Sequence, residues 1–181
     1  MDILRSIQIW DSVSIDVVSV KHRLLLAQSS AELFESSAFF FCLGKSGSVL
    51  VEETPYRFNG HLLMHVPPDQ RVIIDSGSGE AEVFYLEYRA TILPEISSGL
   101  MSSYLERNPF HELQVVRCAD PGNFYDLFEK LADGFNSKNQ TARISLKASF
   151  YALIHRLYTD RESEKDGLIR LSRAEPGVPL L

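Results

Sequence analysis

Apolar and polar positions alternate over much of the first ninety residues, a pattern that is typical of β-strands with one buried face. The clearest alternation runs through Ile7, Ile9, Val13, Ile15 and Val17. Short apolar runs follow at Leu24–Leu26 and Phe39–Phe41, with glycine, serine and proline between the runs. This half of the chain is therefore predicted to consist of strands.

Turn-forming residues divide this half into short segments. Lys45–Gly47 is predicted to form a hairpin turn that leads into a strand at Ser48–Val51. Asn59-Gly60 is predicted to close a short strand that begins at Thr54. Further strands are expected at His61–Val66, Arg71–Asp75 and Ala81–Ala90. Many short strands at close spacing indicate a sandwich or a barrel.

The apolar residues take on the period of a helix after Thr91. One helix is expected between Pro94 and the break at Asn108-Pro109, and a short strand at Leu113–Val116. A second helix is predicted to begin at Asp120-Pro121, where aspartate can cap and proline tolerates the first turn, and to end near Gly134. A longer helix is expected from Thr141 to Tyr158.

The long helix carries one apolar stripe, formed by Leu146, Phe150, Leu153 and Leu157. The stripe is widened beyond a single contact face by Ile144, Tyr151, Ile154 and Tyr158. That width leaves two interpretations open. Either the stripe packs on the chain's own barrel, or part of it meets a second subunit.

Composition narrows the class of protein. A chain of 181 residues with 45% hydrophobic residues can bury one sizeable core. Its net charge of -6 argues against direct binding to a phosphate backbone, which requires a basic surface. The amino terminus shows no secretion signal, and no apolar stretch has the length of a membrane span, so a cytoplasmic location is expected. Cys42 and Cys118 are expected to be buried thiols.

His61 and His65 would share one face of a helix and could then bind one metal ion. The six residues between Gly60 and Pro67 have the length of a strand and are too few for a stable helix. On a strand the two histidines are about 13 Å apart, too far for one ion. The chain also contains no nucleophile elbow, P-loop or dinucleotide glycine fingerprint. We therefore expect no metal site, no cofactor and no catalytic residues.

Four segments carry a resemblance to a known family: Gly47–Val51, Tyr56–Phe58, Gly60–Arg71 and Val83–Tyr88. In this order they resemble the N-terminal cupin-like domain of AraC-type transcription regulators, whose pattern includes Gly-Asp-x-x-x-x-x-Pro-Pro-Gly-x-x-His and a closing aromatic strand. The helices from Asp120 to Tyr158 are similar to that family's dimerisation and linker helices. The chain departs from the pattern at Asp69, where the family usually has glycine, and at Val72, where many members have histidine.

The resemblance implies a mainly β fold with C-terminal α-helices. Residues 1–118 would form a cupin-like double-stranded β-helix, or jelly-roll barrel, that serves as the sensor domain. Residues 119–160 would form a helical dimerisation and linker segment. Residues 161–181, which are charged and then rich in proline and glycine, would be a linker toward a DNA-binding domain that is missing from this chain.

Side chains that face the barrel lumen are the candidate ligand-binding residues. Strand alternation places Val83, Tyr85, Glu87 and Arg89 on one face, and the resemblance implies that this face is the inner one. Phe39, Phe41 and Leu43 are expected to face the lumen from the opposite side. A carboxylate and a phenol among apolar walls can orient a small polar ligand. Alternatively, Glu87 pairs with Arg89 or Arg57 at a wet rim.

The function implied by the resemblance is that of a ligand-sensing and dimerisation module. A small-molecule effector would bind in the barrel, the dimer would form through Leu146, Phe150, Leu153 and Leu157, and DNA would be contacted only through the missing domain. The alternatives are a cupin-type enzyme, such as an isomerase or a metal-dependent oxygenase, and a stand-alone sugar-binding barrel.

Overall fold

The computed structural model describes residues 3–29, 31–77, 79–116, 118 and 120–173. The chain begins with helix α1 (Ile3–Asp11) and continues through strands β1 (Val13–Leu25), β2 (Glu32–Phe34), β3 (Ser37–Val51), β4 (Thr54–Val66), β5 (Gln70–Asp75) and β6 (Ala81–Ile92). The second half contains α2 (Ser98–Glu106), the short 3-10 helix η1 (Pro109–His111), β7 (Gln114–Val116), α3 (Pro121–Asn136) and α4 (Ala142–Arg173). This order confirms the expected fold class, mainly β with C-terminal helices.

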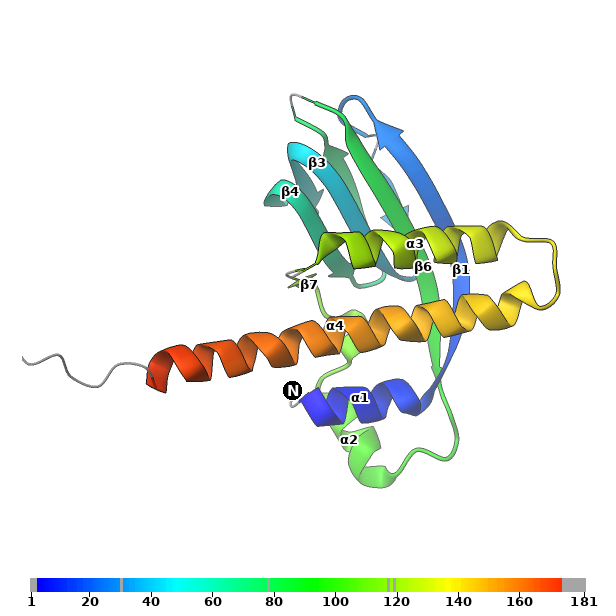
Figure 1. The fold of residues 1–181 in the computed structure, drawn as a ribbon. Helices are drawn as coiled ribbons and strands as arrows, with labels where there is room; N and C mark the ends of the chain where they lie inside the picture. Colours follow the sequence, from blue (N-terminus) through cyan, green and yellow to red (C-terminus); the bar gives the residue numbers. More distant parts are fainter. Residues whose placement is uncertain (1–2, 30, 78, 117, 119, 174–181) are drawn as a thin grey trace, which may run out of the picture.

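The described strands form one antiparallel sheet that bends in the middle of β3 and β4. Strands follow the order β1-β6-β3-β4-β7, and β5 pairs with β3 and with β2. The first half of β3, Ser37–Gly44, pairs with β6, whereas Ser48–Val51 pairs with β5. The long strand β3 therefore pairs with β6 in its first half and with β5 in its second half. The strands curl around an interior in the manner of a jelly roll (Figure 1).

The bend lies where the sequence predicted turns. β3 continues through Lys45–Gly47 with a register shift, and β4 runs unbroken through Asn59-Gly60. The predicted turns are therefore wrong, and the chain instead reverses at Glu52, which has a φ of 52°. A Cβ on Gly47 would lie 2.4 Å from the Asp75 carbonyl oxygen. Glycine is needed at position 47 because the Asp75 backbone and the Phe58 ring leave no room for a side chain, and not because the chain turns back.

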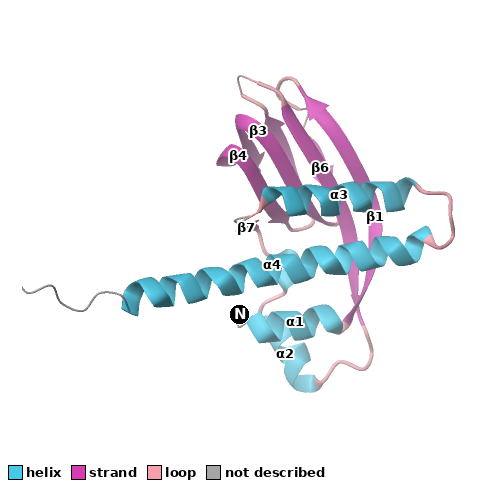
Figure 2. Cartoon of the chain, in the orientation of Figure 1, coloured by secondary structure: helices cyan, strands magenta, loops and turns pink. Residues whose placement is uncertain are grey.

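Each face of the sheet carries its own hydrophobic cluster. The inner cluster includes Phe34, Phe40, Cys42, Met64, Val83 and Tyr85. The outer cluster joins the opposite face to the helices and includes Trp10, Phe41, Tyr88, Phe124, Phe128 and Phe150. Figure 2 shows α3 and α4 lying across the strands on one side of the sheet. Because successive residues of a strand point to opposite faces, neighbours on β3 and β6 belong to different clusters.

Residues 3–11 form a helix and not the strand that their alternation predicted. The buried residues Ser6, Ile9 and Trp10 are spaced by three and four, which is the period of a helix. A short window fits both periods, so packing decides between them. The Trp10 indole N–H donates to the Tyr158 hydroxyl at 3.0 Å, and its ring meets the Phe110 ring edge-on at 4.7 Å. These distant contacts stabilise the helix.

The C-terminal helices begin close to where the sequence placed them. The Asp120 side chain caps α3 by accepting from the backbone N–H groups of Gly122 and Asn123. α4 continues to Arg173, through part of the predicted linker, and Figure 1 shows its far end projecting beyond the rest of the molecule. The remainder of that linker, 174–181, lies outside the described residues. No helix in the described ranges combines the length and apolar character that a membrane span requires.

Candidate functional site

Strand β6 connects the interior of the barrel to the helices. Tyr85 belongs to the inner cluster, whereas its neighbour Phe84 and the nearby Tyr88 belong to the outer one. The Phe84 ring lies 5.7 Å from the Phe128 ring of α3, and the Tyr88 ring lies 5.0 Å from the Phe150 ring of α4. The outer side of β6 is therefore in ring contact with both helices.

Tyr85 places a polar group within the inner cluster. Its side chain is 2% exposed, and its hydroxyl has no hydrogen-bond partner among the described residues. The rings of Phe34 and Phe40 lie 6.1 and 5.3 Å from its own, and the Arg23 guanidinium carbon lies 5.5 Å from its centroid. Burial raises the pKa of Tyr85, and the Glu32 carboxylate raises it further. The hydroxyl is thus a neutral donor that would gain a bond from a ligand's polar atom.

Two further predicted ligand-binding residues, Glu87 and Arg89, follow Tyr85 along β6. Glu87 is half-buried, and its pKa is raised mainly because burial disfavours the carboxylate, while Lys21 acts in the opposite direction. Arg89 is exposed. The strand therefore brings Val83 and Tyr85 into the inner cluster and leaves Arg89 outside it.

Phe39, Phe41 and Leu43 lie on the face opposite to the one expected. Phe39 and Phe41 are buried in the outer cluster beneath the helices, and Leu43 packs against that cluster. Phe40 and Cys42 point into the interior instead. The sequence could not decide between the two faces, because a run of three phenylalanines is apolar at both parities.

Residues of β1 and β2 close the inner cluster beside Tyr85, and the sequence analysis did not assign them to the site. Phe34 on β2 is 2% exposed and stacks on the Tyr85 ring. Glu32 on the same strand pairs with Arg23 at 2.5 Å and with Lys21 at 4.0 Å, both on β1. The only signal in the sequence was the apolar pair Leu33-Phe34, which is too short a run to predict a strand.

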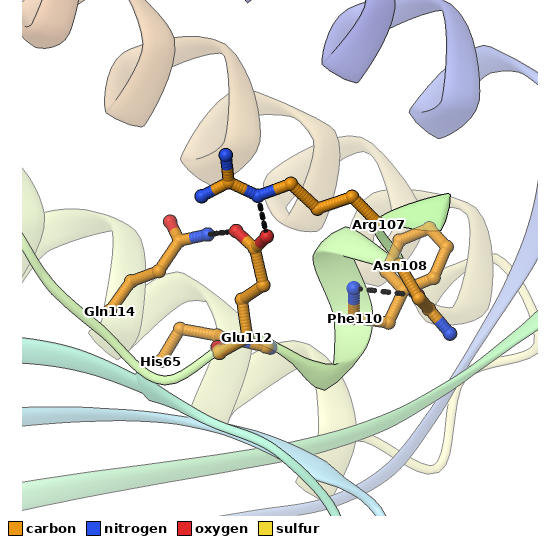
Figure 3. Close-up of polar contacts among 6 residues, drawn as sticks. All are labelled: His65, Arg107, Asn108, Phe110, Glu112 and Gln114. Carbon is orange, nitrogen blue, oxygen red and sulfur yellow. Dashed lines mark hydrogen bonds and ion pairs between the residues drawn. The ribbon is translucent and has the colours of Figure 1, made fainter. Parts of the chain in front are cut away.

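His65 has a structural role. Its Nδ1 lies 2.7 Å from the Glu112 carbonyl oxygen and its Nε2 lies 2.8 Å from the Tyr88 hydroxyl, while the side chain is 3% exposed. In the neutral ring, Nδ1 donates to the carbonyl and Nε2 accepts from the tyrosine. Figure 3 shows the Glu112 carboxylate held by Arg107 and Gln114 above this contact. His65 thus fastens the segment that precedes β7 to the sheet.

The described residues contain no group of three or more histidine, cysteine, aspartate and glutamate side chains placed to hold a metal ion. His61 and His65 both lie on β4, as predicted, where they pair with Leu43 and Phe39 of β3. Four residues of extended strand separate them by about 13 Å. Cys42 is fully buried, and burial raises the pKa of its thiol to about 12, so it is a poor nucleophile at neutral pH.

The apolar stripe of α4 packs inside the monomer. The four residues predicted to form the dimer contact are only 8%, 0%, 0% and 6% exposed, and all lie in the outer cluster: Leu146, Phe150, Leu153 and Leu157. Of the two interpretations, packing on the chain's own barrel describes these residues. A second subunit would reach them only by opening the cluster. Within residues 142–160 of the same helix, the large apolar side chains that are exposed are Ile144, at 74%, and Tyr151, at 40%.

No model of a known protein family matches the sequence, and no curated protein matches it. Solved structures similar to this chain include ToxT from Vibrio cholerae strain SCE256 with a bound unsaturated fatty acid, with a TM-score of 0.43 and 10% identity over 75% of this chain and 53% of ToxT. Another ToxT structure, at 1.65 Å resolution, has a TM-score of 0.41 and 13% identity over 78% of this chain and 57% of ToxT. This chain thus spans about half the length of ToxT.

A Cupin 2 conserved barrel domain protein from Salinispora arenicola is also similar, with a TM-score of 0.34 and 6% identity over 53% of this chain and 85% of that protein. The similar structures thus include ToxT and a cupin barrel protein. At such low identity and TM-score, these similarities assign no ligand and no activity to this chain.

Proposed function

We propose that this chain is the ligand-sensing and dimerisation domain of an AraC-type transcription regulator. A small molecule would bind inside the barrel, and the helices would relay its binding to a DNA-binding domain outside this chain. The proposal is one of binding and not of catalysis, and it implies a cytoplasmic location.

The observation that carries the proposal is the division of β6 between two environments. Inside, the Tyr85 hydroxyl is buried and has no partner among the described residues. Outside, Phe84 contacts α3 through Phe128, and Tyr88 contacts α4 through Phe150. A ligand that forms a hydrogen bond with Tyr85 would therefore contact the same strand that α3 and α4 contact from the outer side. Such a ligand changes the position of the helices only if it binds two arrangements of β6 with different affinity. The coupling free energy between two such sites is typically about 1–3 kcal/mol.

The dimer face in this proposal is the exposed side of α4. Because the stripe through Phe150 is buried in the monomer, association would use Ile144 and Tyr151 together with the projecting end of the helix. Replacing both residues with alanine should then weaken the dimer. Lys130→Ala on α3 is the control, since Lys130 is an exposed polar residue on a different helix.

Two measurements test the function. Sedimentation over a range of protein concentrations should show a dimer that the double alanine variant weakens and the control does not. Thermal-shift screening against small organic acids, sugars and phenols should find a compound that stabilises the wild type and binds Tyr85→Phe several-fold more weakly. A strictly monomeric chain at high concentration would refute the dimerisation role. Equal binding by the wild type and Tyr85→Phe would remove Tyr85 from the site.

A further inference from the structure

The interior of the barrel is filled in part by a residue from a weakly held strand. β2 consists of Glu32–Phe34, and among the described strands it pairs with β5 alone. Phe34 is 2% exposed, whereas the preceding Leu33 is 65% exposed. The Phe34 ring stacks on Tyr85 and meets Phe40 edge-on at 4.9 Å. A short edge strand thus inserts one aromatic ring beside the Tyr85 hydroxyl, which has no hydrogen-bond partner among the described residues.

Ion pairs connect this strand to β1. The Glu32 carboxylate of β2 pairs with Arg23 and Lys21 of β1, and all three side chains keep contact with solvent, at 18%, 43% and 44% exposure. Exposed pairs of this kind are weak and are screened by salt. β2 is held by three residues of pairing, by the hydrogen bond from the Asp69 N–H to the Phe34 carbonyl oxygen, by the buried Phe34 ring and by these two solvent-screened ion pairs. Its backbone pairing is much shorter than that of β3, β4 and β6, so it can open more easily than those strands.

We propose that β2 is a lid on the barrel and that the effector takes the place of the Phe34 ring. The ligand would be a small, flat and mainly apolar molecule with one hydroxyl or carbonyl group. Its ring would stack on Tyr85 where Phe34 stacks now, and its polar atom would pair with the Tyr85 hydroxyl. This inference rests on the proposed function, because it specifies the ligand class and the entry route of the same barrel.

The size of the ligand follows from the packing. The inner cluster consists of side chains that are between 0% and 6% exposed, so a ring-sized molecule enters it only if a ring leaves. The chemistry follows from what the ligand would meet inside the cluster: two aromatic rings, aliphatic walls and the neutral Tyr85 hydroxyl, with the Arg23 guanidinium carbon 5.5 Å from the Tyr85 centroid. A sugar, with a hydroxyl on nearly every carbon, would leave most of its polar groups without partners there.

The first test removes the Phe34 ring and so leaves a cavity beside Tyr85. Phe34→Ala is expected to bind phenol saturably in calorimetry, with a dissociation constant about two- to tenfold lower than that of toluene, which has a similar shape but no hydroxyl. In the double variant Phe34→Ala, Tyr85→Phe this preference for phenol should disappear. The control is Phe128→Ala, which removes the same ring from the outer cluster and should show no preference. Equal binding of phenol and toluene by Phe34→Ala would overturn the proposal.

A second test uses the intact chain and does not depend on the folding of a variant. Hydrogen exchange should show that the backbone amides of Leu33 and Phe34 exchange faster than those of Val49–Val51, which pair with β5 within the core of the sheet. Raising the salt concentration should accelerate the β2 amides selectively, because it screens the Glu32 pairs. If β2 were as protected as β3, no lid would exist.

The outcomes also separate the lid from the function it rests on. An effector that binds wild type and both Tyr85→Phe and Phe34→Ala with equal affinity would refute the lid and leave the sensing function intact. Phenol selectivity in a chain that stays monomeric at every concentration would support the lid and refute the regulator.

Discussion

Phe150→Ala tests whether α4 is part of the monomer's own core. Phe150 is fully buried, and its ring centroid lies 5.0 Å from that of Tyr88, 5.9 Å from Trp10 and 6.4 Å from Phe39. Truncating a buried phenylalanine to alanine costs about 3–5 kcal/mol, from lost transfer free energy and from the cavity that remains. For a chain of this length the melting temperature should fall by roughly 6–20 °C.

Urea unfolding followed by tryptophan fluorescence measures this loss, since Trp10 is the single tryptophan and contacts Phe150. Ile144→Ala on the same helix is the control, because a side chain that is 74% exposed should change the free energy of unfolding by less than about 0.5 kcal/mol. If Phe150 were instead a dimer contact, its effect would depend on protein concentration. A loss below about 1 kcal/mol, or one that shrinks on dilution, would refute the packing described above.

Three further predictions address other parts of the fold. Gly47→Ala should lower the free energy of unfolding in urea by about 1–3 kcal/mol, because the alanine Cβ would lie 2.4 Å from a backbone oxygen. Gly99→Ala is the control: its Cβ would meet no atom within 4 Å on a helix, so it should be neutral or stabilising. Tyr158→Phe should cost about 1–3 kcal/mol by leaving the Trp10 N–H without its partner, and a change below 0.5 kcal/mol, roughly the limit of such measurements, would argue against that bond. Burial raises the pKa of the Cys42 thiol from 9.0 to about 12, so as the pH rises the unfolded chain loses the thiol proton before the folded chain does. The free energy of unfolding should therefore fall between pH 9 and 12, by up to about 1.4 kcal/mol per pH unit. Between pH 8 and pH 10 this fall should be smaller in Cys42→Ala than in the wild type.

Local signals were sufficient where a pattern has one interpretation. The Asp120-Pro121 pair predicted the start of α3, and the structure shows the aspartate cap. The segment between Gly60 and Pro67 predicted a strand, and the structure places it within β4, where His61 and His65 are about 13 Å apart. In these cases the deciding interactions lie within a few residues, so the sequence contains them.

Other predictions failed because the deciding contacts are distant in sequence. The pattern of residues 3–11 fits either a strand or a helix. The helix is stabilised by the hydrogen bond between Trp10 and Tyr158, which lies 148 positions away in the sequence. Lys45–Gly47 has the composition of a turn, yet the chain continues because Gly47 lies against Asp75 of another strand. Turn residues show where a backbone can deviate, but the neighbouring strands determine whether it reverses or bends.

The sequence by itself showed the alternation along β6 and the helical period after Thr91. It also showed that the predicted strands lack a set of metal-ligating residues. Which face is the interior was decided by tertiary structure, since Phe39, Phe40 and Phe41 are equally apolar and only the helices on one side distinguish them. Tertiary structure also placed Phe34 beside Tyr85, because strands that lie 51 positions apart in the chain meet only when the sheet curls.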